Sequence, residues 1–178
     1  MIKGQCDPRF KKIKDIFSYS LESGFETGAA LAIEYKGEVI VNLWGGHKDS
    51  NKSLEWEENT LINVFSVTKG ITAICVSKLI DEGKLDYNQK VSYYWPEYGC
   101  NGKEDTIVSD FLCHRAGMFG FQNGMPKGSW QNWQNFVNHL EAQTPYNAPG
   151  SSQGYHALTY GWLVGELFRR VDGRTVGE

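Results

Sequence analysis

The sequence predicts a helix-rich α+β protein that contains one β-hairpin. Two runs of strand-like composition are joined by a short glycine-containing turn at residues 36–38, and later segments carry apolar residues at helical spacing. The chain has 178 residues, 40% of them hydrophobic and 22% charged, which suits a soluble globular protein with a sizeable core. We therefore expect one domain over residues 1–178.

The first predicted elements are a helix and the hairpin. Apolar residues recur at helical spacing over residues 9–22, and the pattern stops at Ser23-Gly24, which predicts an amphipathic helix. The two strands of the hairpin are expected at residues 29–35 and 39–44. The second strand leads into Gly45-Gly46.

A longer helix is expected after residues 61–65. Gly83 closes this helix, at a position where a left-handed cap residue is common. Its predicted apolar side consists of Val67, Ile71, Ile74, Cys75 and Leu79.

The remaining sequence predicts helices separated by long loops. A short helix at residues 107–114 precedes an aromatic-bearing loop at residues 117–128. Ser129 is predicted to cap a further helix. Its apolar stripe consists of Trp130, Trp133, Val137 and Leu140, which we interpret as packing residues. The last helix is expected from about Tyr155 to Val171.

Composition excludes several function classes. The formal net charge of -3 and the lack of a basic face argue against nucleic acid as a partner. No apolar run approaches the roughly 20 residues of a membrane span, and the start lacks a signal sequence, so we expect a cytoplasmic protein. Neither a metal nor a cofactor is expected, since the cysteines are scattered and are interpreted as free thiols. They are Cys6, Cys75, Cys100 and Cys113.

The strongest chemical signal is Ser66-Val67-Thr68-Lys69, at the start of the predicted helix. Three residues is just under one helical turn, so the hydroxyl of Ser66 and the amine of Lys69 share a face. A serine hydroxyl becomes a nucleophile when a base takes its proton, and a helix N-terminus and partial burial favour a neutral lysine amine. The pattern alone is weak, because about 0.7 such matches are expected by chance in a chain this long.

Further segments around this motif make the chain resemble a known family. The chain is similar to the serine hydrolases that include class C β-lactamases, D-alanyl-D-alanine carboxypeptidases and related esterases. The resemblance covers nearly the whole chain. It rests on Leu43-Trp44-Gly45-Gly46, Phe65 to Gly70, Tyr94-Trp95-Pro96-Glu97-Tyr98, the His114 to Gly117 turn, and Tyr155 after Pro149-Gly150.

The resemblance implies roles for three residues. Ser66 is the expected acylated nucleophile, Lys69 its proton acceptor, and Tyr155 the second acid/base group. A phenol ordinarily titrates near pH 10, so Tyr155 needs a nearby cation, which Lys69 can supply. The implied fold is an antiparallel sheet flanked by helices plus a helical domain. Ser66 would lie on one wall of the cleft between them and Tyr155 across from it.

The tyrosine motif departs from the family pattern. The lactamases and peptidases usually have Tyr-x-Asn, whereas this chain has Tyr155-His156-Ala157. This favours the esterase branch and a small-molecule ester substrate. The alternative is an amide substrate, cleaved by a β-lactamase or a D-alanyl-D-alanine carboxypeptidase. His156 is interpreted as a structural residue rather than a replacement for the asparagine.

The family's third motif has no counterpart after Tyr155. In the family, a strand carrying that motif supplies half of the oxyanion hole, and the backbone N–H of Ser66 would supply the other half. Members are roughly twice as long, so we expect a truncated chain whose oxyanion strand comes from missing sequence or a partner chain. A third reading is a truncated or degenerate, non-catalytic binding or scaffold protein.

One competing motif is present. Residues 150–154 match G-x-S-x-G, the nucleophile elbow of α/β-hydrolases, with Ser152 as the serine. The elbow requires a buried strand before the serine, but residues 143–149 are polar and interrupted by proline. We therefore place Ser152 in a loop leading to Tyr155. His114 is likewise interpreted as holding a turn.

Overall fold

The computed structural model describes residues 2–125 and 128–178. The chain divides into two compact units, Met1–Asn63 and Val64–Glu178. Among the described residues, no helix is long and apolar enough to cross a membrane. Each unit has its own hydrophobic core, so the units are described in turn.

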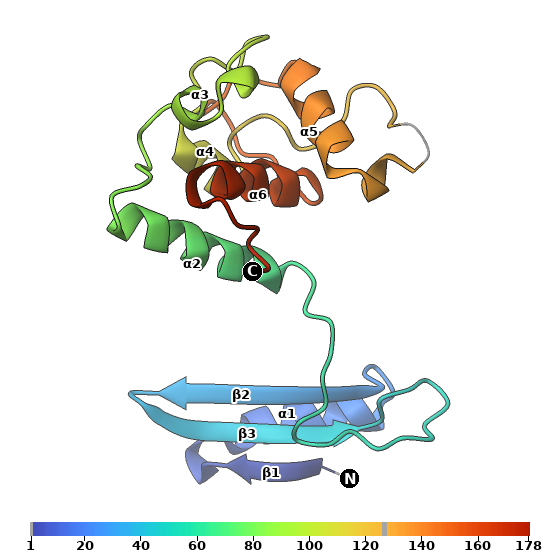
Figure 1. Cartoon of the computed structure of the whole chain (residues 1–178). Coiled ribbons are helices and arrows are strands. Elements are labelled where there is room, and N and C mark those ends of the chain that lie inside the picture. The colour runs from blue at the N-terminus through green and yellow to red at the C-terminus, as the bar shows by residue number, and fades with distance from the viewer. Residues whose placement is uncertain (1, 126–127) are drawn as a thin grey trace. The chain divides into compact units, whose positions relative to one another are not determined.

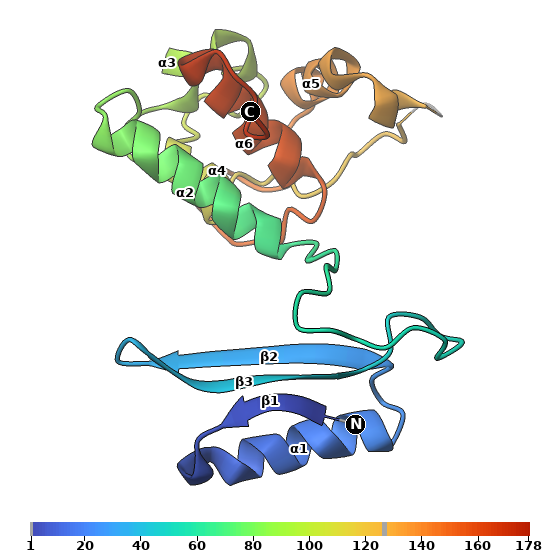
Figure 2. The same cartoon turned by 60° about the horizontal axis from the view of Figure 1, so that its bottom comes forward.

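The first unit is a small antiparallel sheet with one long helix. Its elements are β1 (Ile2–Cys6), a 3-10 helix (Pro8–Phe10), α1 (Lys11–Glu22), β2 (Gly28–Tyr35) and β3 (Glu38–Gly46). The described strands pair antiparallel in the order β1-β3-β2, as Figure 1 shows. Helix α1 lies along the sheet in Figure 2. Its Phe17 joins Ile40, Val41 and Leu43 of β3 in a buried cluster.

The predicted hairpin and first helix are confirmed, but β1 is an addition. Five residues of mixed polarity at the N-terminus gave no strand signal, yet they pair with β3 from Ile2 opposite Gly45 to Cys6 opposite Val41. Glycine is needed at position 4 for this pairing. Its φ is +98°, and the Cβ atom of any other residue would lie 2.0 Å from the Asn42 carbonyl oxygen.

The second unit is helical. Its α-helices are α2 (Val67–Asp81), α3 (Val91–Tyr94), α4 (Val108–Leu112), α5 (Trp133–Ala142) and α6 (Thr159–Asp172). Two 3-10 helices, Pro96–Tyr98 and Ser129–Gln131, join them. Helix α6 contacts α2, α3, α4 and α5 (Figure 1). It contributes buried residues such as Leu163 and Val164 to the core.

The expected position of α2 is confirmed, but only part of its predicted apolar side is buried: Leu79 lies in the core and Cys75 packs against it. Gly83 adopts the predicted left-handed conformation, with a φ of +70°. The described side chains buried on α2 are Thr72, Val76 and Leu79. Val67, Ile71 and Ile74 are exposed instead. Because α2 carries apolar residues on several faces, their spacing did not identify the face that packs on α6.

Two further boundaries differ from the prediction. Asn132, rather than Ser129, caps α5, because its side chain accepts a hydrogen bond from the backbone N–H of Asn135. Helix α6 begins at Thr159, so Tyr155 precedes the helix instead of starting it. The predicted loop at residues 117–128 is irregular where described, but its residues 126–127 lie outside the described residues.

Packing around α6 includes the predicted tryptophans. Phe136 of α5 stacks on Trp162 of α6 with ring centroids 3.7 Å apart, and Trp130 packs against both rings. The indole N–H of Trp133 donates to the buried carboxylate of Glu166. Arg169 and Arg170 neutralise that carboxylate. The two predicted tryptophans therefore take part in packing.

Candidate active site

Ser66 and Lys69 lie at the N-terminal end of α2. Ser66 directly precedes the helix, and Lys69 belongs to its first turn. The Lys69 Nζ atom lies 3.1 Å from the Ser66 Oγ atom, which is hydrogen-bond distance. The three-residue spacing in the sequence therefore places the amine and the hydroxyl together as expected.

The residue before Ser66 has an uncommon backbone conformation. Phe65 has a φ of +45°, in the left-handed region that bulky residues rarely adopt. The chain turns sharply here, and the backbone N–H of Thr68 donates to the Phe65 carbonyl. Such strain persists only where the surrounding structure holds it, and it is common at functional sites.

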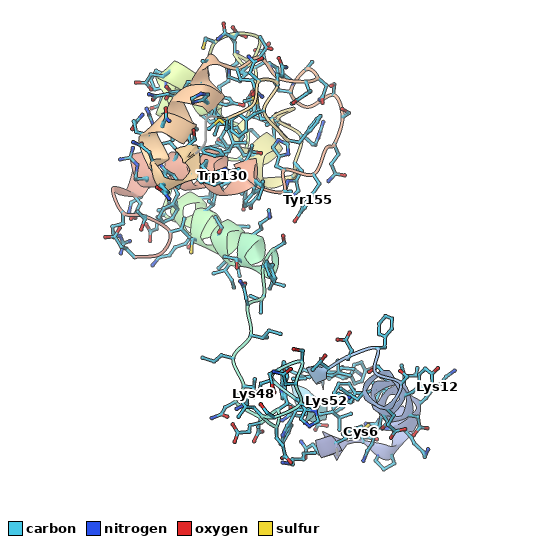
Figure 3. All side chains as sticks on the ribbon, turned by 90° about the vertical axis from the view of Figure 1, so that its right-hand side faces the viewer. Cys6, Lys12, Lys48, Lys52, Trp130 and Tyr155 are labelled. Atoms are coloured by element: carbon cyan, nitrogen blue, oxygen red, sulfur yellow. The ribbon has the colours of Figure 1, made fainter. Side chains whose placement is uncertain are left out.

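Tyr155 reaches Ser66 from a distant part of the sequence. It lies in the irregular segment before α6, and its hydroxyl donates to Ser66 Oγ at 2.7 Å. Figure 3 labels Tyr155 on the helical unit. Ser66 Oγ therefore has both the lysine amine and the tyrosine hydroxyl within hydrogen-bond distance.

Lys69 is held by groups from the Tyr155 segment and α6. Its Nζ atom donates to the Ala157 carbonyl at 3.0 Å and lies 5.1 Å from the centre of the Tyr155 ring. It also lies 5.7 Å from the Tyr160 ring, and the Tyr160 hydroxyl donates to the Lys69 carbonyl. These contacts fix the ammonium between Ser66 and two aromatic faces.

The electrostatic setting favours ionisation of Tyr155. The hydrogen bond with Ser66, followed by the interaction with the Lys69 ammonium, lowers the pKa of the Tyr155 phenol below its ordinary value. The sequence argument required a cation near this tyrosine, and Lys69 occupies that position.

The His114 ring packs against the Tyr155 ring. It has a φ of +60°, and its ring centre lies 4.8 Å from that of Tyr155. Its Nδ1 atom accepts a hydrogen bond from the backbone N–H of His156, and its carbonyl accepts one from Gly154. Its expected role in a turn is confirmed. The same turn also positions the segment that carries Tyr155.

His156 is a buried structural residue. Its Nδ1 atom lies 2.6 Å from the Gly154 carbonyl, and its Nε2 atom accepts a hydrogen bond from the backbone N–H of Met118. The carbonyl can only accept, so the proton is assigned to Nδ1 and the ring is neutral. Burial lowers the pKa of His156 to about 4. Its side chain points into the core, so it does not take the place of the family's asparagine.

Sequence reasoning missed two contributors to this cluster. The Ala157 carbonyl holds Lys69, but a backbone group leaves no signal in residue type. Tyr160 lies on the first turn of α6, and nothing in its spacing connects it with Lys69. Both contacts depend on tertiary structure.

Ser152, the serine of the G-x-S-x-G match, lies in the irregular segment before Tyr155. Residues 143–154 include no strand, so Ser152 lacks the buried strand that a nucleophile elbow requires. In the part of the chain that the structure describes, no group of three or more His, Cys, Asp or Glu residues could hold a metal ion. The four cysteines are free thiols, and none is fully buried.

The sequence matches a known family over most of its length. The family model described as Beta-lactamase matches residues 13–178. The chain is 36% identical over 176 residues to "Esterase/beta-lactamase LipL" of Mycobacterium tuberculosis, covering 96% of this chain and 39% of that protein. It is 27% identical over 166 residues to "Protein flp" of Staphylococcus aureus, covering 90% of this chain and 33% of that protein.

Solved structures agree with this match. The crystal structure of a family VIII carboxylesterase is 40% identical, with a TM-score of 0.89, and the match covers 99% of this chain and 48% of that chain. A penicillin-binding protein homolog from Caulobacter crescentus is also 40% identical, with a TM-score of 0.92 and the same coverage. The expected fold, an antiparallel sheet with helices and a helical region, is confirmed. The chain spans about half the length of these structures.

Proposed function

This chain belongs to the beta-lactamase family, and we propose that it is a serine hydrolase that cleaves carboxylic esters through an acyl-enzyme on Ser66. The observation that carries the proposal is the convergence of Lys69 and Tyr155 on the Ser66 Oγ atom, at 3.1 Å and 2.7 Å. Nucleophilic catalysis requires a hydroxyl next to a group that can take its proton.

In the proposed acylation step, Ser66 Oγ attacks the ester carbonyl carbon. In the reactive form Lys69 has released its extra proton, so the hydroxyl proton passes to its amine and a tetrahedral oxyanion forms. The bond from the carbonyl carbon to the leaving oxygen then breaks. Tyr155 donates its proton to that oxygen, and the alcohol leaves with the acyl group on Ser66. The lowered pKa of Tyr155 suits this role, since a more acidic phenol transfers its proton more readily.

Deacylation reverses these roles. Tyr155, now a phenolate stabilised by the Lys69 ammonium, takes a proton from water, and the resulting hydroxide attacks the acyl carbon. The bond to Ser66 Oγ breaks, and Lys69 returns the proton to the serine. The products are the carboxylic acid and the free enzyme.

The oxyanion needs two donors. We assign one to the backbone N–H of Ser66, at the N-terminal end of α2. The second is assigned to a strand from further sequence or a partner chain, because the third motif that supplies it in the family has no counterpart here. A chain that never receives this second donor would be a non-catalytic family member, which is the remaining alternative.

An ester is preferred over a lactam or peptide because position 157 is alanine. The Ala157 carbonyl holds Lys69, and its methyl group offers no hydrogen bond to a substrate amide. The alternative activity is that of a β-lactamase or D-alanyl-D-alanine carboxypeptidase. Similarity to a penicillin-binding protein homolog favours that alternative, similarity to a family VIII carboxylesterase favours the ester, and "Esterase/beta-lactamase LipL" carries both activities in its name.

Labelling with a fluorophosphonate probe tests the proposal. We expect one probe per chain on Ser66 by intact mass and peptide mapping. Ser66→Ala should abolish labelling, and Ser152→Ala is the matched control because it removes the competing serine and should leave labelling intact. Absence of labelling in folded protein would support the non-catalytic reading, and labelling at Ser152 would favour the elbow motif.

Substrate class is then decided by comparing turnover of nitrocefin with that of p-nitrophenyl acetate and butyrate. The ester proposal requires higher kcat/KM values for the two esters. A wide margin in favour of nitrocefin would assign the chain to the β-lactamase alternative.

A further inference from the structure

An apolar cavity lies beside the candidate active site. Its volume is about 370 Å3, at the small end of the range for ligand sites in proteins. The side chains that form its apolar lining are Phe119, Phe121, Met125, Trp130, Ala157 and Leu158. None of its lining residues carries a charge, so the cavity suits a small apolar group.

Ala157 joins this cavity to the reactive cluster. Its carbonyl oxygen accepts the hydrogen bond of Lys69 Nζ, which in turn lies 3.1 Å from Ser66 Oγ, while the same residue lines the cavity. Leu158, the next residue, also lines it. The contacts from Ser66 through Lys69 to Ala157 therefore link the reactive hydroxyl to the wall of an apolar space.

The rim of the cavity is apolar and accessible. Leu158 is 58% exposed, Trp130 is 50% exposed, and Phe119 is 38% exposed. Figure 3 labels Trp130 and Tyr155 on the same unit. Covering such side chains with a hydrocarbon removes apolar area from water on both partners, which is favourable for binding.

Building on the proposed ester hydrolysis, we propose that this cavity binds an unbranched apolar acyl chain of the substrate, and that Leu158 and Trp130 determine the preferred chain length. The acyl group, unlike the alcohol, stays on Ser66 through both halves of the reaction. Binding energy from its chain can therefore lower both barriers.

The test is a series of alkylphosphonofluoridates with alkyl chains from ethyl to octyl. Ser66 Oγ forms a bond to phosphorus, the phosphorus–fluorine bond breaks, fluoride leaves, and the hydroxyl proton passes to Lys69. The alkyl group remains on Ser66 as an acyl chain does. We expect the second-order labelling rate constant to rise about two- to fourfold per methylene until the cavity is full.

Leu158→Ala should flatten this dependence on chain length, and Leu158→Met should retain it. Ile74→Ala is the matched control, because Ile74 is an aliphatic residue of similar exposure that does not line the cavity. Probes in which only the alkoxy chain varies form the second arm. The acyl assignment is overturned if the rate follows alkoxy length alone, or if Leu158→Ala leaves the alkyl dependence as steep as in the wild type.

A binding experiment separates this inference from the proposed function. Affinities of 2-alkanones for Ser66→Ala protein are measured by tryptophan fluorescence, which Trp130 can report. We expect tighter binding with each added methylene, and loss of that trend when Leu158→Ala is added. If Ser66 is labelled but neither rate nor affinity depends on chain length, the cavity inference fails and the hydrolase proposal stands. If affinity follows chain length but no probe labels Ser66, the hydrolase proposal and the acyl assignment both fail.

Discussion

Ser66 accepts hydrogen bonds from both of its polar neighbours. Lys69 Nζ and the Tyr155 hydroxyl both act as donors to its Oγ atom. A hydroxyl has two acceptor sites and one proton, so both acceptor sites are occupied in this arrangement. For the serine to lose its proton, one neighbour must become an acceptor. The lowered pKa of Tyr155 and the proximity of Lys69 place both residues where such an exchange can occur.

The sequence identified the three side chains of this cluster but not how they are supported. Ser66 and Lys69 follow from a local spacing on one helix. Tyr155 followed from family resemblance, and its expected place on the helix is wrong because the helix begins later. Its contact with Ser66 joins residues 89 positions apart, and local periodicity carries no information about such a pair.

A pH prediction follows from His156. Its pKa of about 4 in the folded protein lies below the value near 6.5 expected when unfolded, so the unfolded chain binds the proton more readily. The stability it contributes is present above pH 6.5 and is lost as the pH falls through 4. We expect the free energy of unfolding to drop by about 2–3 kcal/mol from this group between pH 7 and pH 4.

Urea unfolding at several pH values, followed by circular dichroism, measures this effect. His156→Gln should remove that part of the pH dependence, at a cost in stability near neutral pH because it disturbs two buried hydrogen bonds. His139→Gln, on α5, is measured alongside as a second histidine-to-glutamine replacement, and the two variants are compared with the wild type. Equal slopes for His156→Gln and the wild type would show that His156 does not cause the acid sensitivity.

Among the helices and strands, the sequence predicts best where a single face is apolar or where a turn residue is distinctive. The hairpin and the end of α2 at Gly83 are confirmed for this reason. Strand β1 was missed because it has only five residues, with a glycine at its centre. The polar Lys3 and Gln5 on either side of Gly4 leave too few apolar positions to show a strand pattern. Only part of the predicted apolar side of α2 is buried, because apolar residues occur on several of its faces.

A buried lysine holds the end of α5. Lys103 is 1% exposed, and its ammonium donates to the carbonyls of Glu141 and Gln143, at the C-terminal end of the helix. These carbonyls have no partner within the helix, and a cation at this end is favoured by the helix dipole. We expect Lys103→Met to lower the free energy of unfolding by about 1–3 kcal/mol, because it leaves both carbonyls without this donor.

The matched control is Lys90→Met in the same unit. Lys90 pairs with Asp105 at 2.8 Å, but both side chains are exposed, so its loss should cost clearly less stability than the loss of Lys103. Urea midpoints of the two variants and the wild type give the comparison. Similar losses for Lys103→Met and Lys90→Met would mean that the buried contacts do not stabilise α5.

The two units have hydrophobic cores of different size. The described cluster in the first unit has four buried apolar residues, Phe17, Ile40, Val41 and Leu43. The cluster in the second unit is larger and includes the aromatic packing around α6. Composition and length predicted a single domain, but they cannot show how apolar residues divide between cores, since that depends on which segments pack together.

The difference in core size leads to a prediction about stability. Because stabilisation grows with buried apolar area, the first unit should open at lower free energy than the second. Native-state hydrogen exchange with mass spectrometry measures this opening for each segment. We expect the free energy of opening to be at least about 2 kcal/mol lower for the amides of β2 and β3 than for those of α6. A denaturant concentration that exposes β2 and β3 to exchange should leave the amides of α6 protected. If all segments instead exchange with one common free energy, the 178 residues unfold as one cooperative domain, and the two cores support each other fully.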